Sequence, residues 1–293
     1  MNHLAAVGFG YTARALAARL DRRAWQITGT SRGADDVENI RAAGFNGVLF
    51  NPETDPDELV GALASATHLL VSAAPTTAGD PLLGKISDRF NELVGLRWIG
   101  YLSTVGVYGD RGGDWVDEDT APEPSSERGR RRLNAENSWR FAAELHANLA
   151  MQVFRLPGIY GPGRSGFDKL RDGNARRIIK PGQVFNRMHV DDIAGALLAA
   201  IDGAEPGFAV YNLSDDEPAP PQDVVAFAAR LMGVAAPPEV TFDAAEMTPM
   251  ARSFYGENKR VSNKRMKSEL GYQLKFPTYR EGLADIWRHE SER

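Results

Sequence analysis

The stretch Val7-Gly8-Phe9-Gly10-Tyr11-Thr12-Ala13 follows a short apolar run and opens a segment of helical period. Glycine permits a tight turn at Gly8 and lets the backbone approach a pyrophosphate at Gly10, while Ala13 allows the helix to pack close to the strand. The N–H groups that begin such a helix attract phosphate. The stretch therefore predicts a dinucleotide site at Gly8, Phe9, Gly10, Tyr11 and Thr12. A glycine-rich turn without a ligand is the alternative.

Beyond this turn, short apolar runs of strand length alternate with longer segments of helical period. The alternation predicts a parallel sheet with helices on both faces. The expected strands are 4–7, 25–30, 47–50, 68–72, 98–102 and 151–156. The expected helices are 12–20, 36–43, 57–66, 81–94 and 130–149. Strands and helices in this order indicate an α/β protein with a doubly wound parallel sheet, the Rossmann fold.

After Pro157 the alternation of apolar runs and helical segments is interrupted, because glycines and prolines recur through residues 158–182 and indicate loops and short elements. A helix over 192–201, a strand over 209–213 and a helix over 221–232 follow, and Asp191 or Asp192 is the expected cap of the first of them. The predicted organisation is an NADP-binding domain over 1–158, to which 186–213 return. A smaller substrate-binding C-terminal cap region over 159–293 completes it.

Composition narrows the class of protein. The chain has 293 residues, 43% of them hydrophobic and 25% charged, as in ordinary soluble globular proteins. A net charge of -5 argues against nucleic acid and membrane surfaces as partners. The absence of cysteine excludes disulfides, thiolate metal sites and cysteine nucleophiles. No basic region precedes an apolar stretch at the N-terminus, so we expect a cytoplasmic protein.

The end of the second expected strand bears on the choice of cofactor. A site that prefers NAD carries an acidic residue about 20 positions after the turn, yet no carboxylate lies between Arg22 and Ala34. Ser31 and Arg32 instead offer a hydroxyl and a cation suited to a 2′-phosphate. NADP is therefore predicted over NAD, with a solvated surface arginine as the alternative interpretation of Arg32.

Two further segments carry recognisable motifs. One is Tyr101-Leu-Ser-Thr-Val-Gly-Val-Tyr108-Gly-Asp110. The other is Pro124-Ser-Ser-Glu-Arg128-Gly129-Arg-Arg-Arg132-Leu-Asn-Ala135-Glu136, which falls in the frame of Pro-x-x-x-Tyr-Gly-x-Ser-Lys-x-x-Ala-Glu. Both segments resemble the short-chain dehydrogenase/reductase superfamily in its extended epimerase/dehydratase branch. The turn departs from the usual Gly-x-x-Gly-x-x-Gly spacing, and Arg128 and Arg132 replace the Tyr and Lys. The resemblance thus indicates an atypical member.

The resemblance also implies roles for several residues. Ser103 or Thr104 would hydrogen-bond a substrate oxygen, and a strand-end hydroxyl that satisfies local backbone groups is the alternative. Ala73, Ala74 and Pro75 would pass beneath the riboses of the cofactor, and Pro157 and Gly158 would flank the nicotinamide. Simple strand-to-loop packing is the alternative for these small residues. Homodimers through two helices are common in the superfamily, and the long helix after Arg130 could form such a homodimer; an apolar face buried inside the monomer is the alternative.

Arg128 and Arg132 cannot perform every function of the Tyr and Lys that they replace. Arg128 stays protonated near neutral pH and can only polarise an oxygen or bind an anion, whereas Arg132 can still hold ribose hydroxyls. Arg128 and Arg132 lie on the same face of the helix if the helix already includes this segment. Four arginines over 128–132 cannot all face one ligand, so at least one or two of them must be charged residues on the protein surface. A carbonyl reduction would need its proton from water, Ser103 or Tyr108.

Later landmarks of the branch are 154–163, 187–192 and 210–215. Arg164 and Arg187 are candidates for binding a substrate anion, and a structural ion pair is the alternative for each. His189, Asp191 and Asp192 could form a metal site or a catalytic pair, but a cluster at a helix start is favoured, so no metal is expected.

Two hypotheses for function follow. The first is an NADP-linked oxidoreductase or epimerase-like enzyme without the Tyr-x-x-x-Lys pair, acting on an anionic small molecule. The second is a catalytically silent protein that binds NADP(H) as a sensor or scaffold. The surviving frame around Ser103 and Thr104 favours the enzyme.

Overall fold

The computed structural model describes residues 1–292, and the chain folds into two compact units. The first unit comprises 1–104, 127–155 and 194–211. The second comprises 105–126, 156–193 and 212–293. Residues 105–126 and 186–193 thus group with the second unit, whereas the boundaries expected from sequence placed them with the dinucleotide-binding domain.

The first unit is built on a seven-stranded parallel sheet in the order β11-β7-β5-β4-β1-β2-β3. Its strands are β1 (Asn2–Val7), β2 (Trp25–Ser31), β3 (Asn46–Leu49), β4 (His68–Val71), β5 (Trp98–Thr104), β7 (Ala150–Leu156) and β11 (Gly207–Asn212). The predicted doubly wound α/β fold is confirmed. The strand expected over 209–213, in the segment predicted to return to this domain, joins the six others as the edge strand β11.

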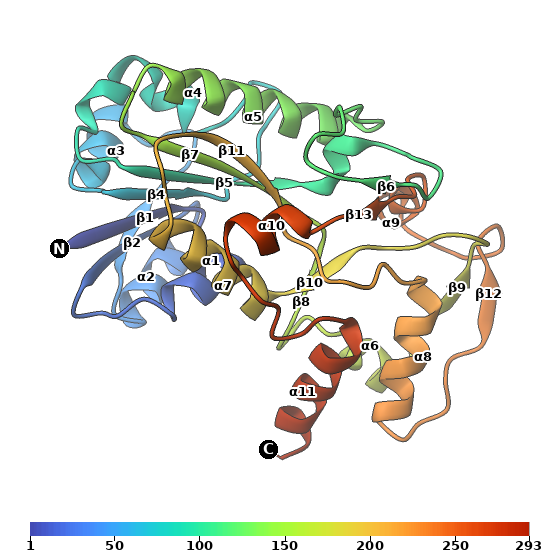
Figure 1. Cartoon of the computed structure of the whole chain (residues 1–293). Helices are drawn as coiled ribbons and strands as arrows, with labels where there is room; N and C mark the ends of the chain where they lie inside the picture. Colours follow the sequence, from blue (N-terminus) through green and yellow to red (C-terminus); the bar gives the residue numbers. More distant parts are fainter. Residues whose placement is uncertain (293) are drawn as a thin grey trace. The chain divides into compact units, whose positions relative to one another are not determined.

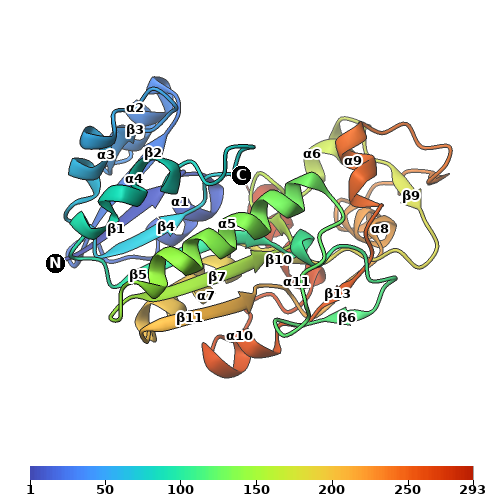
Figure 2. The same cartoon turned by 90° about the horizontal axis from the view of Figure 1, so that it is seen from above.

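Helices cover both faces of this sheet (Figures 1 and 2). On one face lie α3 (Pro56–Leu63), α4 (Leu83–Ile86) and α5 (Glu127–Glu144). On the other lie α1 (Tyr11–Ala17), α2 (Ala34–Ala42) and α7 (Val190–Asp202). The buried core beneath α3 to α5 includes the fully buried side chains of Tyr101 and Trp139. The helices carry apolar residues at spacings of three and four because the helix face with that spacing packs against this core.

Two expected helices differ from the structure. The single helix predicted over 81–94 is instead the short α4 followed by a 3-10 helix, η1 (Ser87–Glu92), and the backbone leaves the α-helical path at Ile86. Gly84, Ser87 and Asp88 are weak helix formers, so the apolar spacing overstated the helix. The helix predicted over 130–149 begins earlier, at Glu127, and ends at Glu144, because residues 145–149 turn into β7.

The second unit contains small sheets and short helices. Its strand pairs are β6 (Trp115–Val116) with β13 (Arg260–Val261), β8 (Gly158–Tyr160) with β10 (Arg187–His189), and β9 (Arg177–Ile179) with β12 (Glu239–Thr241). Its other helices are η2 (Val105–Tyr108), α6 (Phe167–Arg171), α8 (Pro221–Leu231), α9 (Pro249–Phe254), α10 (Lys264–Glu269) and α11 (Tyr279–Ser291). A core centred on Tyr160, Phe167 and Tyr279 joins several of them.

His68, the first residue of β4, should make the stability depend on pH. The ring is 7% exposed and lies against Trp25, with 4.7 Å between ring centroids. Burial, with the nearby Arg97 charge, lowers the pKa of His68 to about 4. As pH falls from about 6.5 to 4, the unfolded chain binds the proton first, so stability falls by on the order of 2 kcal/mol after allowance for solvent screening.

Urea unfolding of wild type and His68→Gln at several pH values between these limits measures that contribution. The variant should show a flatter dependence of the unfolding free energy on pH. His289→Gln is the matched control, because the side chain of His289 is 63% exposed. Equal slopes for His68→Gln and wild type would contradict the assignment.

Candidate functional site

The turn after β1 is fixed by contacts to the neighbouring strands. Gly8 has a φ of +89°, a left-handed conformation that favours glycine. Its N–H donates to Thr30 Oγ1 at 3.0 Å, and Ser72 Oγ donates to its carbonyl. A Cβ at Gly8 would lie 2.7 Å from Ser72 Oγ, whereas a Cβ at Gly10 would meet nothing within 4 Å. The turn is therefore tightly held at Gly8 and open at Gly10, where α1 begins.

The other turn residues differ in accessibility. Phe9 is 5% exposed, and its ring lies 5.2 Å from that of Phe45 and directly against Gly29. The Phe9 side chain therefore belongs to the packing of the unit, which leaves only its backbone to contact a cofactor. Thr12 is 6% exposed and Tyr11 is half-buried.

At the end of β2, a carboxylate that sequence reasoning missed lies beside the predicted phosphate contacts. Ser31 Oγ donates a hydrogen bond to Asp36 Oδ2 at 3.1 Å, while the Arg32 side chain is exposed. Asp36 lies beyond the stretch searched for an acidic residue, but the start of α2 brings it back to the strand end. A carboxylate here opposes the 2′-phosphate of NADP and can accept bonds from ribose hydroxyls.

The loop after β4 meets the end of β1. The backbone N–H groups of Ser72 and Ala73 both donate to the carbonyl of Val7, at 2.9 and 3.1 Å. Ala73 and Pro75 are half-buried and Ala74 is exposed. Because the carboxyl ends of parallel strands share one edge of the sheet, this loop and the glycine turn lie at the same edge.

Ser103 and Thr104, the last residues of β5, have different surroundings. Ser103 is 5% exposed, and its hydroxyl donates to Glu136 Oε1 from α5. Glu136 in turn forms a buried ion pair with Arg155 of β7, with 2.8 Å between Oε2 and Nη2. Thr104 is half-buried, and successive strand residues point to opposite faces. Ser103 therefore ties the strand to α5, and Thr104 is the better candidate to meet a substrate.

Arg132 of α5 extends its guanidinium to the carboxyl edge of the sheet. Its Nη1 lies 2.9 Å from the carbonyl oxygen of Leu102, 3.1 Å from the hydroxyl of Tyr101 and 3.5 Å from the carbonyl oxygen of Ala73. Among residues 1–292, no atom accepts a hydrogen bond from Nε or Nη2 of Arg132. A fixed positive charge with further donors thus stands where β4 and β5 end.

Two buried groups beneath Arg132 were not anticipated from sequence. Tyr101 is fully buried, and burial raises the pKa of its phenol, which therefore stays protonated. Asp80 is 6% exposed, its Oδ1 accepts the N–H groups of Leu82 and Leu83, and burial raises the pKa of its carboxyl. Tyr101 opens a motif that assigns it no role, and Asp80 lies in a loop outside the motifs, so only packing brings them near the arginine.

The other three arginines of the motif, Arg128, Arg130 and Arg131, lie toward the surface. Since α5 begins at Glu127, Arg128 and Arg132 lie four residues apart within one helix, although Arg128 is exposed. Arg130 and Arg131 both pair with the carboxylate of Glu127, at 3.1 and 3.0 Å from Nε. These two arginines are surface charges.

In the second unit, Tyr108 is fully buried and its hydroxyl donates to Asn212 Oδ1 at 2.8 Å. This burial removes Tyr108 as the proton source that the sequence suggested. Pro157 and Gly158 also belong to this unit, and the N–H of Gly158 donates to Asn186 O at 3.2 Å.

The cluster at the start of α7 is structural in its contacts. The N–H of Asp191 donates to His189 Nδ1 at 3.1 Å. Asp192, expected to cap its own helix, instead accepts the Tyr272 hydroxyl and the N–H groups of Lys275 and Phe276, at 2.9, 2.7 and 3.0 Å. It therefore holds the segment before α11. Over residues 1–292, no group of three or more His, Asp or Glu side chains is arranged to bind a metal.

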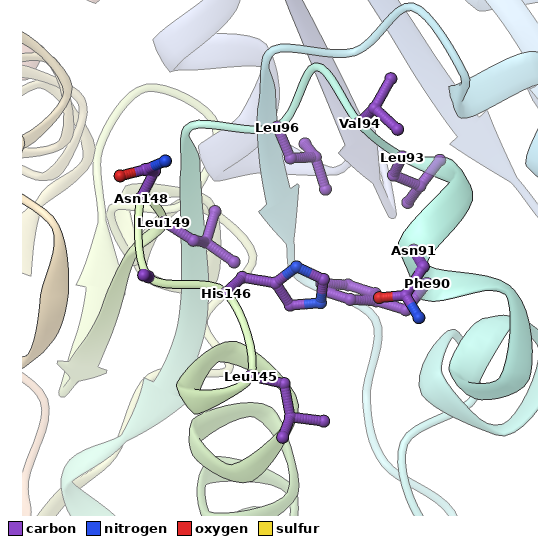
Figure 3. A pocket seen from close by; sticks show the side chains of 10 residues that line it. Phe90, Asn91, Leu93, Val94, Leu96, Leu145, His146, Asn148 and Leu149 are labelled. Atoms are coloured by element: carbon purple, nitrogen blue, oxygen red, sulfur yellow. The ribbon is translucent and has the colours of Figure 1, made fainter.

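A cavity of about 420 Å³ opens in the first unit, away from the motifs (Figure 3). Leu93, Val94 and Leu96 before β5, and Leu145 to Leu149 before β7, line most of it. These are the amino ends of the strands, whereas the glycine turn and Arg132 lie at the carboxyl ends. None of the helices within residues 1–292 is long and apolar enough to span a lipid bilayer.

Known proteins with similar sequences and structures cover nearly the whole chain, although no family model matches it. A protein of unknown function from Silicibacter pomeroyi DSS is 50% identical, covers 99% of both chains and superposes with a TM-score of 0.89. A protein from Methylobacillus flagellatus, described provisionally as an NAD-dependent epimerase/dehydratase, is 25% identical, with 99% and 98% coverage and a TM-score of 0.72. Protein YeeZ of Escherichia coli K12 is 28% identical over 94% of this chain and 97% of its own.

Less similar structures share the fold. UDP-glucuronic acid 4-epimerase from Bacillus cereus, solved with NAD, is 17% identical, covers 99% of this chain and 97% of its own, and has a TM-score of 0.77. The human epimerase family protein SDR39U1, solved with NADPH, is 20% identical, with 98% and 99% coverage and a TM-score of 0.74. The carboxyl edge of the sheet in this chain is therefore built on a scaffold that carries either nicotinamide cofactor in other proteins.

Proposed function

We propose that the chain, whose structural neighbours are NAD-dependent epimerase/dehydratase proteins of the short-chain dehydrogenase/reductase superfamily, is an NADP(H)-dependent oxidoreductase or epimerase-like enzyme. Its substrate is a small anionic molecule. It works without the Tyr-x-x-x-Lys pair, since Arg128 and Arg132 stand in those positions.

The residues at the carboxyl edge fit a dinucleotide. The backbone of the turn from Gly8 to Thr12 is open at Gly10, where a pyrophosphate would approach. Arg32 would hold the adenosine phosphate together with Ser31, whose hydroxyl would exchange its acceptor Asp36 for that phosphate. Ala73 to Pro75 would line the path of the riboses. When bound, the nicotinamide supplies or accepts a hydride at a substrate carbon.

The placement of Arg132 is the observation that carries the proposal. The guanidinium is fixed by Leu102 O and Tyr101, yet Nε and Nη2 keep their hydrogens for other acceptors. Ribose hydroxyls beside the nicotinamide would be such acceptors. Arg132 can therefore do the part of the missing lysine that concerns binding, and its positive charge also favours negative charge developing on a substrate oxygen.

Proton transfer must then use water. Ser103 Oγ already donates to Glu136, and Tyr108 is fully buried with its hydroxyl bound to Asn212. In the proposed reduction, the carbonyl carbon would receive the hydride from the nicotinamide, Thr104 would donate a hydrogen bond to the substrate oxygen, and a water molecule would give its proton to that oxygen. The resulting hydroxide leaves to solvent.

The same engaged hydroxyls favour a second candidate, a catalytically silent protein that binds NADP(H) as a sensor or scaffold. Such a protein keeps the cofactor edge and needs no proton donor. Titration of purified protein with NADPH and NADP, followed by an assay of NADPH absorbance with a panel of carbonyl compounds and nucleotide sugars, separates the two. Binding with turnover supports the enzyme, binding without any turnover supports the silent protein, and failure to bind either nicotinamide cofactor contradicts both.

Selectivity between the two cofactors should respond in opposite directions to two neighbouring substitutions. Arg32→Ala removes the cation and should weaken NADP binding about tenfold while leaving NAD binding nearly unchanged. Asp36→Asn removes a negative charge and should strengthen NADP binding several-fold relative to NAD. Fluorescence titrations with NADPH and NADH measure both. Tighter binding of NAD than NADP by wild type would refute the NADP preference.

A further inference from the structure

In the second unit, Arg187 of β10 is a half-buried cation that forms no ion pair with the residues the structure describes. Its guanidinium lies over the ring of Tyr279, 5.4 Å from the centroid. Among residues 1–292, no carboxylate oxygen comes within 4.0 Å of it, and its Nη1 is buried without a hydrogen-bond acceptor. The residue as a whole is half-buried, so part of the side chain can be reached from solvent. The structural ion pair considered from sequence is therefore not formed.

Asp215 lies beside this arginine and is also incompletely bonded. Its N–H donates to Arg187 O at 2.8 Å, and its Oδ1 accepts the N–H of Glu217 at 3.2 Å. The carboxyl oxygen Oδ2 is buried without a partner, as is the hydroxyl of Ser214. Asp215 is 1% exposed and Ser214 is fully buried. Buried polar atoms are rarely left without partners in proteins, so these atoms point to a polar group that they bind.

Charge determines what that group is. Burial raises the pKa of Asp215 to about 8, so its carboxyl is mostly protonated at neutral pH and can donate a hydrogen bond. Burial also raises the pKa of Tyr160, which stays neutral. Glu217 pairs with Arg280, and Asp192 is occupied by the segment before α11. The cluster therefore presents a net positive charge in a poorly solvated place, which favours an anion.

We propose that Arg187, with Asp215 as a second donor, binds a carboxylate group on a small molecule. The planar guanidinium offers two parallel N–H donors that match the two oxygens of a carboxylate. The ring of Tyr279 lies against one face of the guanidinium, 5.4 Å from it, so the N–H edge rather than that face is offered to a ligand. The inference deepens the proposed function and rests on it, since it names the substrate class as carboxylate-bearing.

Sodium acetate, without cofactor, is the probe. The thermal unfolding midpoint of the full chain is followed against acetate concentration at constant ionic strength, with sodium chloride and sodium phosphate as parallel series. A saturable rise with acetate, larger than with phosphate or chloride, supports the site, since a ligand that binds only the folded state stabilises it. If the unfolding midpoint shows no saturable rise with acetate, the proposal is overturned, and Nη1 of Arg187 is bound to an internal water only. A rise with phosphate equal to that with acetate overturns the carboxylate assignment.

Variants assign the response to the two residues. Arg187→Met should weaken acetate binding at least about tenfold, and Arg187→Lys should weaken it less. Asp215→Asn keeps a donor and should bind acetate within about threefold of wild type, whereas Asp215→Ala should lose about tenfold. Arg288→Met is the control, because that arginine of α11 is 63% exposed. Unchanged acetate binding by Arg187→Met, or strong loss in Asp215→Asn, would overturn the assigned roles.

Different results would contradict the proposed NADP(H)-dependent function and the proposed carboxylate site at Arg187. Acetate binding to a protein that binds no NADP(H) would contradict the proposed function and leave the carboxylate site intact. Turnover of NADPH with carboxylate-bearing carbonyl compounds, at the same KM in wild type and Arg187→Met, would contradict the carboxylate site and leave the proposed function intact.

Discussion

Arg155→Met is expected to destabilise the protein by about 3–5 kcal/mol, the typical result of removing one partner from a buried ion pair. The Arg155 and Glu136 side chains are 6% and 4% exposed, and Nη2 and Oε2 lie 2.8 Å apart. The substitution leaves the Glu136 carboxylate buried without its cation. Because Glu136 also accepts the hydroxyl of Ser103, the end of β5 should loosen at the same time.

Urea unfolding of two further variants identifies the cause of the loss. The double variant Glu136→Gln with Arg155→Met removes both charges and should recover part of the lost stability, since no unpaired charge remains buried. Arg140→Met is the matched control on α5, because Arg140 and its partner Glu144 are 56% and 53% exposed. An exposed pair is worth less than about 1 kcal/mol. If Arg155→Met costs no more than Arg140→Met, the buried pair does not hold β5, α5 and β7 together.

Gly8→Ala is expected to reduce NADP(H) affinity about a hundredfold and to lower stability by about 1–3 kcal/mol. The added methyl group would lie 2.7 Å from Ser72 Oγ and 3.1 Å from Ala73 N, at a φ of +89°. Ser72 cannot move away cheaply, because its hydroxyl donates to the carbonyl of Gly8 itself. The turn must therefore shift, and with it the backbone that would meet the pyrophosphate.

Gly10→Ala is the matched test, because it separates binding from folding. Its backbone, with φ of -87°, suits alanine, and the new methyl group would meet nothing within 4 Å. Stability should stay within about 0.5 kcal/mol of wild type. Affinity for NADP(H) should nevertheless fall at least about tenfold, because the methyl group would stand where the phosphates approach. Urea unfolding and NADPH fluorescence titration measure the two quantities. Wild-type affinity in Gly10→Ala would exclude this turn as the pyrophosphate site.

Local patterns in the sequence were sufficient for the fold. The order of apolar runs and helical periods predicted the parallel sheet, and the glycine turn predicted where β1 passes into α1; both are confirmed. These features depend on residues within a few positions of one another, so spacing alone reveals them. The same reasoning failed at 81–94, where apolar spacing suggested one helix but weak helix formers interrupt it.

The sequence alone determined the α/β fold class and the edge of the sheet expected to hold a cofactor. It also showed that the tyrosine and lysine of the family motif are absent. Only the tertiary structure decided which hydroxyl is engaged by Glu136, that Asp36 returns to Ser31, and that Arg187 and Asp215 meet without an ion pair. The physical reason is that such contacts depend on how strands and helices pack. Burial and hydrogen bonding, which set the charge state and reach of each group, follow from that packing and not from spacing along the chain.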